Sequence, residues 1–319
     1  MIPFIRLQEL RRMADAMSSD MPMSSSMLNH LIAEITAEGP VYRLLGNHPD
    51  AEEPLYFVRA LAGVRLLVLT GQAPQLEAHL KGLTSNLGKP EYNELTWELF
   101  KQVLLSHPGE ILAGMSRPVQ QHHPRRAAAL LQGLGMLGRE RVRLLEIGAC
   151  AGLNLLLDRY RWFGPDWEWG DAQSPVRLTA SGPTPAPFTI VDRAGCDVDP
   201  RDPADPFDAM ILRSFIPHER DVEQIELDDA IEVAAESRLR VDAANAVEWL
   251  KIQLETAKDQ ADVTTVVWHS QVWWYLTAQD HSDIDEILTA TSRRHPIARI
   301  AYEPDRWASA PRLQLHIYS

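Results

Sequence analysis

Two glycines four residues apart, Gly148 and Gly152, mark the part of this 319-residue chain that is best suited to bind a ligand. The largely apolar run at 144–147 predicts a buried strand before them, and the leucines that follow predict a helix. Because glycine lacks a Cβ atom, a ligand can approach the backbone closely there. In open α/β sheets, ligands bind beyond the carboxyl ends of the strands, where the strand order reverses. We therefore expect a ligand-binding turn at 148–152, with Glu146 near the end of the preceding strand.

A strand–turn–helix unit would show the same pattern if its glycines only allowed close packing and it bound no ligand. The position of the turn favours a ligand site, because the turn opens the half of the chain in which strands alternate with helices. Segment 144–154 contains neither the G-x-G-x-x-G of nicotinamide and flavin sites nor the G-x-x-x-x-G-K-[ST] of phosphate-binding loops. A nicotinamide oxidoreductase is therefore a weaker interpretation of this turn.

Acidic residues follow two later predicted strands. Asp197 and Asp199 lie in AGCDVDP, and Asp242 follows RLRV. In folds of this kind an acid at the end of the next strand accepts hydrogen bonds from ribose hydroxyls, so Asp197 or Asp199 could fill that role. The alternatives are a turn aspartate before a proline for Asp199 and an N-cap of the helix at 246–250 for Asp242.

The stretch VVWHSQVWWYL places several chemically versatile side chains after another predicted strand. Val266 and Val267 predict the buried strand, and Trp268, His269 and Ser270 lie at its end. Histidine has a pKa near neutrality, so His269 is the candidate general base, with a core histidine as the alternative. Trp268 and Ser270 are candidate substrate-pocket residues.

Three further groups of residues lie outside these strand ends. The aromatic residues 273–275 follow on a predicted helix, so Tyr275 is a candidate for lining a substrate pocket, with core packing as the commoner alternative. Glu303 ends a late strand in IAYEPD and could reach the cleft, but we favour a solvated strand-end acid. His218-Glu219, an isolated pair before a predicted helix, is expected in a capping region.

The segment EIGACAG at 146–152 resembles the D/E-x-G-x-G-x-G motif of class I S-adenosylmethionine (SAM) dependent methyltransferases. Gly148 and Gly152 match the first and third glycines of that motif, and Cys150 stands at the second. The resemblance implies SAM as the cofactor. It also assigns Glu146 to holding the loop and the amino-acid end of the ligand.

The same resemblance implies contacts from later strand ends. It favours Asp197 over Asp199 for the ribose hydroxyls, and it implies that Asp242, together with Ala243, contacts the adenine amino group. The cofactor-binding residues that it implies are Glu146, Gly148, Ala149, Gly152, Asn154, Asp197, Asp242 and Ala243.

A wider pattern, GACAGLNLLLDRY followed by SPV and GCDVDPRDP, is similar to an uncharacterised bacterial family known as a domain of unknown function. Its members combine a helical N-terminal part with a methyltransferase-like core, and the similarity covers most of the chain. PVQQHHPRR stands where the family has a glutamine-threonine-asparagine-glutamate stretch, so Gln120 and Arg126 match while His122 and His123 do not. The resemblance makes Arg126 a further substrate-pocket candidate.

Hydrophobic periodicity divides the chain near residue 138. Leu7, Leu10 and Met13 recur at helical spacing, and the N-terminal part is predicted to be helical. In the second part, short β-like runs alternate with helical stretches, which is typical of a mostly parallel sheet with helices on both faces. The last two runs lack a helix between them, so we expect an antiparallel pair at one edge. The prediction is an α-helical domain at 1–138 and an α/β domain at 139–319 with a Rossmann-like SAM-methyltransferase core.

Composition excludes several classes of protein. The 31 Lys and Arg against 44 Asp and Glu give a net charge of −13, which disfavours a nucleic-acid-binding protein because phosphate neutralisation supplies most non-specific affinity. No apolar run is long enough to span a bilayer, and the N-terminus does not resemble a signal peptide. With only two cysteines, Cys150 and Cys196, we expect a reduced, cytoplasmic protein. No metal site is expected, because C-x-x-C and H-E-x-x-H are absent and adjacent histidines at 122–123 would point apart on a helix.

These patterns together predict a SAM-dependent methyltransferase that acts on a small-molecule acceptor. No residue is diagnostic of catalysis, because aligning an acceptor with a methyl group leaves little trace in a sequence. The alternative is a non-catalytic protein of the same fold, either a SAM or nucleotide sensor or an interaction module, and Cys150 at the second glycine position favours it. Turnover of SAM would distinguish the two, and neither the acceptor nor the oligomeric state follows from the sequence.

Overall fold

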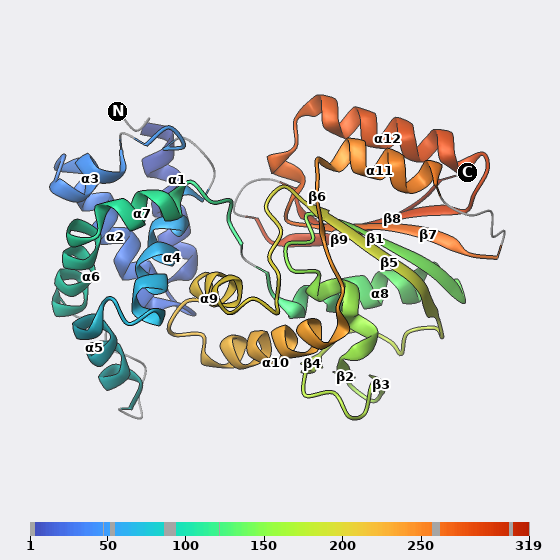
Figure 1. Ribbon diagram of the computed structural model, residues 1–319, viewed down its shortest axis with the longest axis horizontal. Helices are drawn as coiled ribbons and strands as arrows, with labels where there is room; N and C mark the ends of the chain where they lie inside the picture. Colours follow the sequence, from blue (N-terminus) through green and yellow to red (C-terminus); the bar gives the residue numbers. More distant parts are fainter. Residues whose placement is uncertain are drawn as a thin grey trace. The chain divides into compact units, whose positions relative to one another are not determined.

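The computed structural model describes residues 4–46, 48–51, 55–85, 94–120, 122–256, 262–305 and 309–318. It divides into two compact units, one formed by Met1–Gln121 with Met210–Gln224, and the other by His122–Ala209 with Ile225–Ser319. Residues 122–138 therefore group with the sheet, although their pattern is helical. Figure 1 shows the helices and strands of both units.

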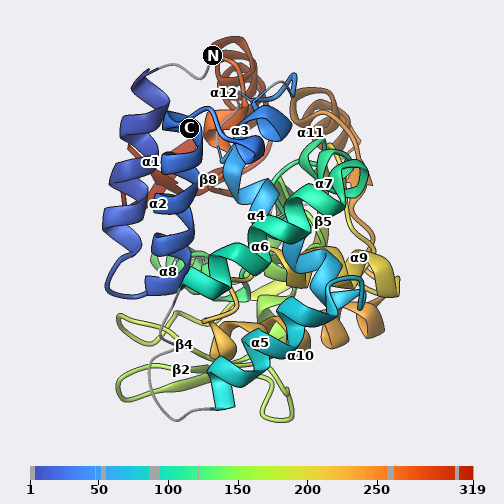
Figure 2. The same cartoon turned by 90° about the vertical axis from the view of Figure 1, so that its left-hand side faces the viewer.

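Helices make up most of the first unit (Figure 2). They are α1 (Phe4–Met17), α2 (Pro22–Thr36), α3 (Pro40–Leu45), α4 (Tyr56–Leu69), α5 (Pro74–Ser85), α6 (Glu94–Ser106) and α7 (Pro108–Met115). In α2 the buried Leu28, Leu31, Ile32 and Ile35 follow the i, i+3, i+4, i+7 pattern of one helix face. The predicted helical character of the N-terminal part is thus confirmed for these elements.

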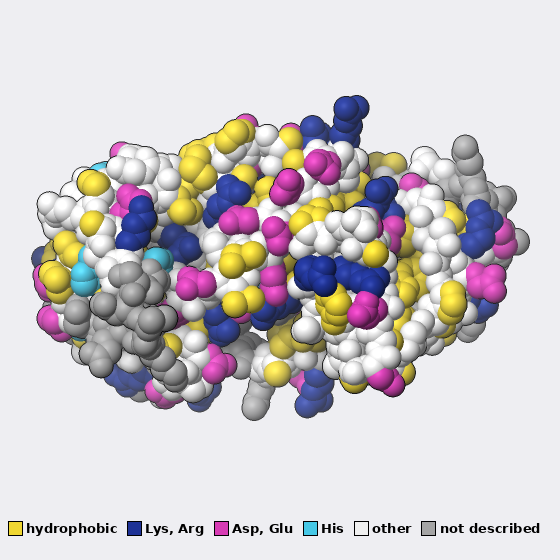
Figure 3. Space-filling model, turned by 90° about the horizontal axis from the view of Figure 1, so that it is seen from below, with side chains coloured by type: hydrophobic (Ala, Val, Ile, Leu, Met, Phe, Trp, Pro, Cys, Tyr) yellow, Lys and Arg dark blue, Asp and Glu magenta, His cyan; other side chains and the backbone are white. Residues whose placement is uncertain are grey.

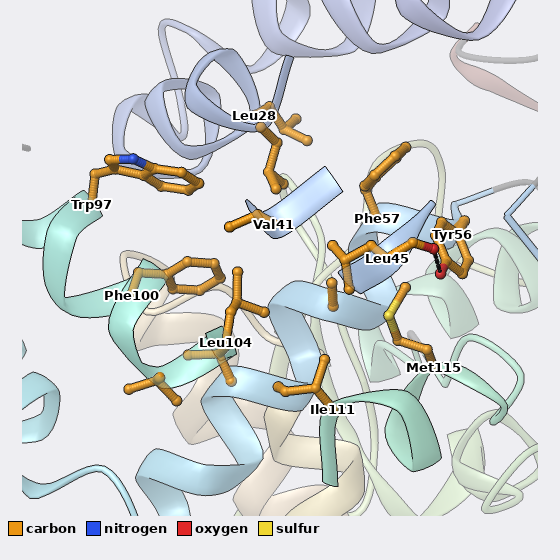
Figure 4. Close-up of a cluster of buried hydrophobic side chains, with 14 of the residues drawn as sticks. Leu28, Val41, Leu45, Tyr56, Phe57, Trp97, Phe100, Leu104, Ile111 and Met115 are labelled. Atoms are coloured by element: carbon orange, nitrogen blue, oxygen red, sulfur yellow. Dashed lines mark hydrogen bonds between the residues drawn. The ribbon is translucent and has the colours of Figure 1, made fainter. Parts of the chain in front are cut away.

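The core of this unit joins helices that are distant in sequence. Figure 4 shows Leu28 of α2, Trp97 of α6 and Ile111 of α7 within one buried cluster. The Tyr56 hydroxyl is buried there and donates a hydrogen bond to the carbonyl of Leu45. Burial of these side chains supplies the main driving force that holds the helices together.

The second unit is built on a sheet with the strand order β6-β5-β1-β7-β8-β9. Its strands are β1 (Arg141–Ile147), β5 (Thr189–Asp197), β6 (Asp242–Ala243), β7 (Thr264–Ser270), β8 (Ile297–Pro304) and β9 (Pro311–Tyr318). All neighbouring pairs are parallel except β8 with β9. The expected antiparallel pair at one edge is therefore confirmed, and the fold is mixed α/β with a mostly parallel six-stranded sheet.

Helices cover both faces of this sheet (Figure 1). On one face, α11 (Ala246–Glu255) and α12 (Ala278–Ser292) bury Leu250 and Ile284 against Leu145 and Val267. On the other face lies α8 (Ala127–Leu137), whose Gly133 packs directly on Ile300 of β8. Strand β7 lies between these two layers, and all of its residues are buried, including the polar Thr264, Thr265, His269 and Ser270.

Some local predictions differ from the structure. The stretch after the glycine turn is a kinked 3-10 segment, η2 (Leu153–Arg159), rather than a regular α-helix. The aromatic run forms only a short 3-10 turn, η3 (Trp273–Tyr275), instead of the predicted helix. A third 3-10 turn, η1 (Pro124–Arg126), precedes α8. Such 3-10 turns are frequent as connectors and at the ends of helices.

The remaining elements are a small second sheet and two helices. The small sheet has the order β3-β2-β4 and consists of β2 (Arg161–Phe163), β3 (Glu168–Gly170) and β4 (Arg177–Thr179). Helices α9 (Pro206–Ser214) and α10 (Asp221–Ser237) each contain residues of both units. Within the described part of the chain, no helix has both the length and the apolar character needed to span a membrane.

Candidate functional site

The strand order reverses next to β1. Strands β5 and β6 follow on one side of β1, and β7 and β8 follow on the other. The register aligns Ile147 with both Cys196 and His269, so the carboxyl ends of β1, β5 and β7 lie at one edge of the sheet. In open α/β sheets this is the edge at which ligands bind.

Glu146 is the most deeply buried acid at this edge. Its Oε1 accepts hydrogen bonds from Asn154 Nδ2 at 2.9 Å and from Trp268 Nε1 at 3.0 Å. Its Oε2 and the Oδ1 of Asn154 are buried and have no hydrogen-bond partner. Burial raises the pKa of Glu146 to about 8, although the two hydrogen bonds and the nearby charge of Arg126 act in the opposite direction. Two buried oxygens, one on Glu146 and one on its hydrogen-bonded neighbour Asn154, therefore have no hydrogen-bond partner.

The glycine turn has the left-handed backbone that its residues suggest. Gly148 and Gly152 have φ angles of +70° and +73°, and Cys150 adopts φ +50° although it carries a side chain. A Cβ on Gly148 would lie 2.6 Å from Val272 Cγ2, and one on Gly152 would lie 3.0 Å from Leu239 Cδ2. The space beside these two glycines is thus occupied by protein side chains. The backbone conformation favours glycine at both positions, and at Gly148 a Cβ would also displace Val272.

Asp197 ties the end of β5 to the glycine turn. Its Oδ2 accepts the Cys150 N–H at 2.9 Å, and its Oδ1 accepts the Asp199 N–H at 3.0 Å. Burial raises the pKa of Asp197, opposed by the hydrogen bond from the Cys150 N–H and by the nearby charge of Arg201. The side chain of Asp199 instead pairs with Arg201. Of the two acids in AGCDVDP, Asp197 is the one that contacts the turn.

Asp242 and Ala243 form the short strand β6 beside Cys196 and Asp197, and both are exposed. The Asp242 carboxylate accepts a hydrogen bond from Trp249 Nε1 at 2.7 Å. The N-cap of α11 is Asn245, whose side chain accepts the Val247 N–H. The alternative role of Asp242 as the N-cap of this helix is therefore wrong.

A histidine–carboxylate pair lies at the ends of β7 and β8. His269 Nδ1 is 2.8 Å from Glu303 Oε1, which also accepts the Val272 N–H at 3.1 Å. The His269 ring stacks on Trp273 with 4.3 Å between ring centroids. Burial lowers the pKa of His269, while Glu303 opposes that shift. His269 Nε2 is buried without a partner.

Glu303 departs from the expected solvated acid, because it is only 7% exposed. The sequence signal that could have found it is the two-residue period of β8, which places 303 on the same face as 297, 299 and 301; of these, 297 and 301 are buried and 299 is partly buried. Its partner His269 could not be inferred, because the two residues are 34 positions apart in sequence.

The register separates the site residues into two clusters. Glu146 pairs with Trp268, which pairs with Ile300, and Ile300 packs on α8. His269 is one residue further along β7, so it points to the opposite face, toward α12. Glu146 with Asn154 and Trp268 therefore forms one cluster, and His269 with Glu303 forms a second cluster at the same edge.

Arg126 is the candidate whose charge acts on both clusters. It is partly buried, and its guanidinium interacts electrostatically with Glu303 and Glu146. Its Nη2 lies 3.3 Å from Oε1 of Gln271, a residue that itself has a φ of +53°. Two strained non-glycine residues, Cys150 and Gln271, therefore lie at this edge, and such strain is concentrated at functional sites.

The other predicted pocket residues are distributed more loosely. Ser270 is buried at the end of β7, whereas Tyr275 is 39% exposed in η3. His122 is buried, and burial lowers its pKa to about 3, so it is neutral near pH 7. Among the described residues, no group of three or more His, Cys, Asp and Glu side chains is arranged to hold a metal ion.

These observations define a mixed α/β protein with a buried acidic site at the switch in strand order. The family model described as "Uncharacterized protein conserved in bacteria (DUF2332)" matches residues 8–319. The chain therefore belongs to this bacterial family, as its motifs predicted. No curated protein matches the sequence.

Proposed function

We propose that this protein binds SAM at the carboxyl end of β1 and transfers its methyl group to a small-molecule acceptor. The observation that carries the proposal is the pair of unpaired buried oxygens, Glu146 Oε2 and Asn154 Oδ1, with the Arg126 guanidinium near them. The amino-acid end of SAM carries an ammonium group, which needs acceptors, and a carboxylate, which needs a cation. Buried polar groups without partners are rare in folded proteins, so a missing partner is a reason to expect a ligand or an ordered water.

The surrounding fold supports the same ligand. The strand order around β1 and the position of Asp197 at the end of β5 match the arrangement by which dinucleotide-binding folds hold a nucleoside. Each carboxylate oxygen of Asp197 accepts one backbone N–H, and it keeps a further lone pair for a ribose hydroxyl. Asp242 and Ala243 are exposed beside it, where an adenine amino group could meet them.

In this proposal the residues of the chain bind SAM, orient it and accept a proton from the methyl acceptor. SAM supplies a methyl group bonded to a positively charged sulfur. Glu146 and Asn154 hold the ammonium group, and Asp197 orients the ribose. Glu303 keeps the proton of His269 on Nδ1, so that Nε2 is free to accept a proton from a hydroxyl, amine or thiol.

Calorimetric titration with three ligands tests the binding claim. SAM and its demethylated product S-adenosylhomocysteine carry the amino-acid end, whereas 5′-methylthioadenosine lacks it. We expect Glu146→Gln to weaken S-adenosylhomocysteine binding about tenfold or more and to leave methylthioadenosine binding nearly unchanged. Glu140→Gln, which alters an exposed glutamate just before β1, is the matched control. Equal losses for both ligands would place the amino-acid end elsewhere, and absence of heat with SAM would remove the cofactor claim.

The pKa of Glu146 adds an independent signature. Because the carboxyl is protonated in half or more of the molecules below about pH 8, capture of an ammonium group should release a proton at pH 7. Titrations in buffers of different ionisation enthalpy should show that proton, and Glu146→Gln should abolish it.

A SAM or nucleotide sensor without catalysis is the second candidate. Two observations favour it, namely the side chain of Cys150 at the second glycine position and Val272 against the first glycine. A sensor would bind S-adenosylhomocysteine with the same dependence on Glu146 but would not consume SAM with any acceptor.

A further inference from the structure

The helical unit contains a cavity that the proposed SAM site does not use. Its volume is about 110 Å³, and its walls come from α1, α2, α4, α5, α6 and the segment 214–218. Most of the lining is apolar, and three of the lining residues are Met17, Met23 and Met27. Methionine side chains are flexible and polarizable, and they are frequent in binding surfaces that adapt to their ligand.

A few polar groups join this apolar lining. His218 Nε2 lies 3.3 Å from the carbonyl oxygen of Leu80, so that nitrogen carries the proton and Nδ1 is the hydrogen-bond acceptor. Burial and the nearby charge of Arg65 lower the pKa of His218, which keeps the ring neutral. Arg65 itself donates from Nε to the Arg213 carbonyl at 3.2 Å and from Nη2 to Gln224 Oε1 at 2.9 Å.

The volume and lining limit what could fill the space. An apolar cavity left empty destabilises a protein in proportion to its volume, and this cavity adjoins the buried core of the helical unit. An engineered apolar cavity of about 150 Å³ in another protein binds benzene, so the present cavity suits a molecule with a single ring. A charged ligand would lose its hydration against this mostly apolar lining, and the Arg65 guanidinium already donates to Arg213 and Gln224, whereas a neutral donor would find the acceptor nitrogen of His218.

We propose that this cavity binds a small neutral molecule with an apolar body the size of one ring and a single hydrogen-bond donor, as in a phenol. The proposal concerns the helical unit alone and does not depend on SAM binding. Its elements are the apolar walls formed by α2 and α4 and the His218 ring beside them.

Titration of the full chain with phenol, toluene and benzoate tests this assignment. The three probes share a ring, but toluene lacks the donor and benzoate is anionic. We expect phenol to bind about tenfold more tightly than toluene and benzoate to bind least. Absence of phenol binding up to its solubility limit, or a preference for benzoate, would overturn the proposal.

Two variants locate the binding. Ala62→Leu extends a side chain of α4 into the lining and should weaken phenol binding at least tenfold, whereas Ala278→Leu at the exposed start of α12 should not. His218→Leu removes the acceptor and should reduce phenol binding to the level of toluene, so it tests the donor claim even if Ala62→Leu fails to fold. Unchanged phenol affinity in a folded His218→Leu protein would show that the ring does not contact the ligand.

Discussion

At the scale of single residues, Glu146 combines two properties that rarely coexist in a purely structural acid. It is 1% exposed, and it is not paired with a cation through a hydrogen bond in the described structure. A buried carboxyl of this kind is held in its neutral form, because water no longer stabilises the charge. The cost of ionising Glu146 is therefore a measurable property of the folded state.

The pH dependence of stability should report that cost. The folded pKa of Glu146 is about 8 against an ordinary value of 4.5, so the folded state binds more protons between these values. Stability should therefore fall by a few kcal/mol as pH rises from about 5 to 8. Urea unfolding at several pH values should show this loss in the wild type and a flatter profile in Glu146→Gln. Identical profiles would mean that the carboxyl ionises freely in the folded protein.

The pair of His269 and Glu303 gives a second residue-scale prediction. Glu303→Ala leaves His269 Nδ1 and the Val272 N–H without their shared acceptor, and an unpaired buried donor costs about 1–3 kcal/mol. Glu303→Gln keeps an acceptor oxygen and should lose much less. Comparison of the two variants by urea unfolding checks this, and equal losses would point to the charge of Glu303 as the stabilising feature.

At the scale of elements, two separate constraints favour glycine in the turn after β1, namely the backbone conformation and the space available for a side chain. Gly148 has a left-handed backbone, and Val272 leaves no room for a Cβ there. Gly138 at the end of α8 also has a left-handed backbone, but the space beside it is open. Substitution of alanine separates these constraints, because an L-residue in that conformation costs about 1–2 kcal/mol by itself.

We therefore expect Gly138→Ala to cost about 1–2 kcal/mol and Gly148→Ala to cost clearly more. The difference should shrink when Val272→Ala is added, because a smaller side chain makes room for the new Cβ. Unfolding free energies of the three variants measure this. Equal losses for the two single variants would show that the Val272 contact relaxes freely.

Helix capping shows how an element can depend on a distant segment. The N-terminus of α2 has no side-chain cap of its own, and the N–H groups of Met23 and Ser24 donate to the carboxylate of Glu219 at 3.0 Å each. Glu219 was expected in a capping region before its own neighbouring helix. It caps instead a helix almost two hundred residues earlier, where a negative charge also interacts favourably with the helix dipole.

At the scale of the whole molecule, the charge distribution indicates whether nucleic acids are binding partners. Lysine and arginine side chains are interspersed with aspartate and glutamate over the face in Figure 3. Release of counterions from the phosphates drives non-specific binding to nucleic acids, and it requires a positively charged protein surface. The mixed charges of this face and the net charge of −13 do not provide one.

Fluorescence anisotropy with a labelled DNA duplex at low ionic strength should therefore show no binding at micromolar protein. A rise in anisotropy that disappears with added salt would reveal a local basic surface and would contradict this prediction.

Local sequence patterns determined a large part of this structure. The buried strand before Gly148 and the turn itself follow from side-chain periodicity and from backbone angles that favour glycine, and the antiparallel pair follows from the lack of a helix between the last two β-like runs. These are short-range properties, because they involve residues that are neighbours along the chain. The sequence therefore determined that Glu146 stands at the end of a buried strand, directly before a left-handed turn.

Only the tertiary structure decided what surrounds that acid. Trp268 reaches Glu146 across 122 positions of sequence, and His269 meets Glu303 because β7 and β8 pair in one register. That register also sends His269 and Glu146 to opposite faces of the sheet, which a motif cannot express. Strand pairing joins distant segments through backbone hydrogen bonds and burial, so the partners of a site residue, unlike its position on a strand, depend on the whole folded chain.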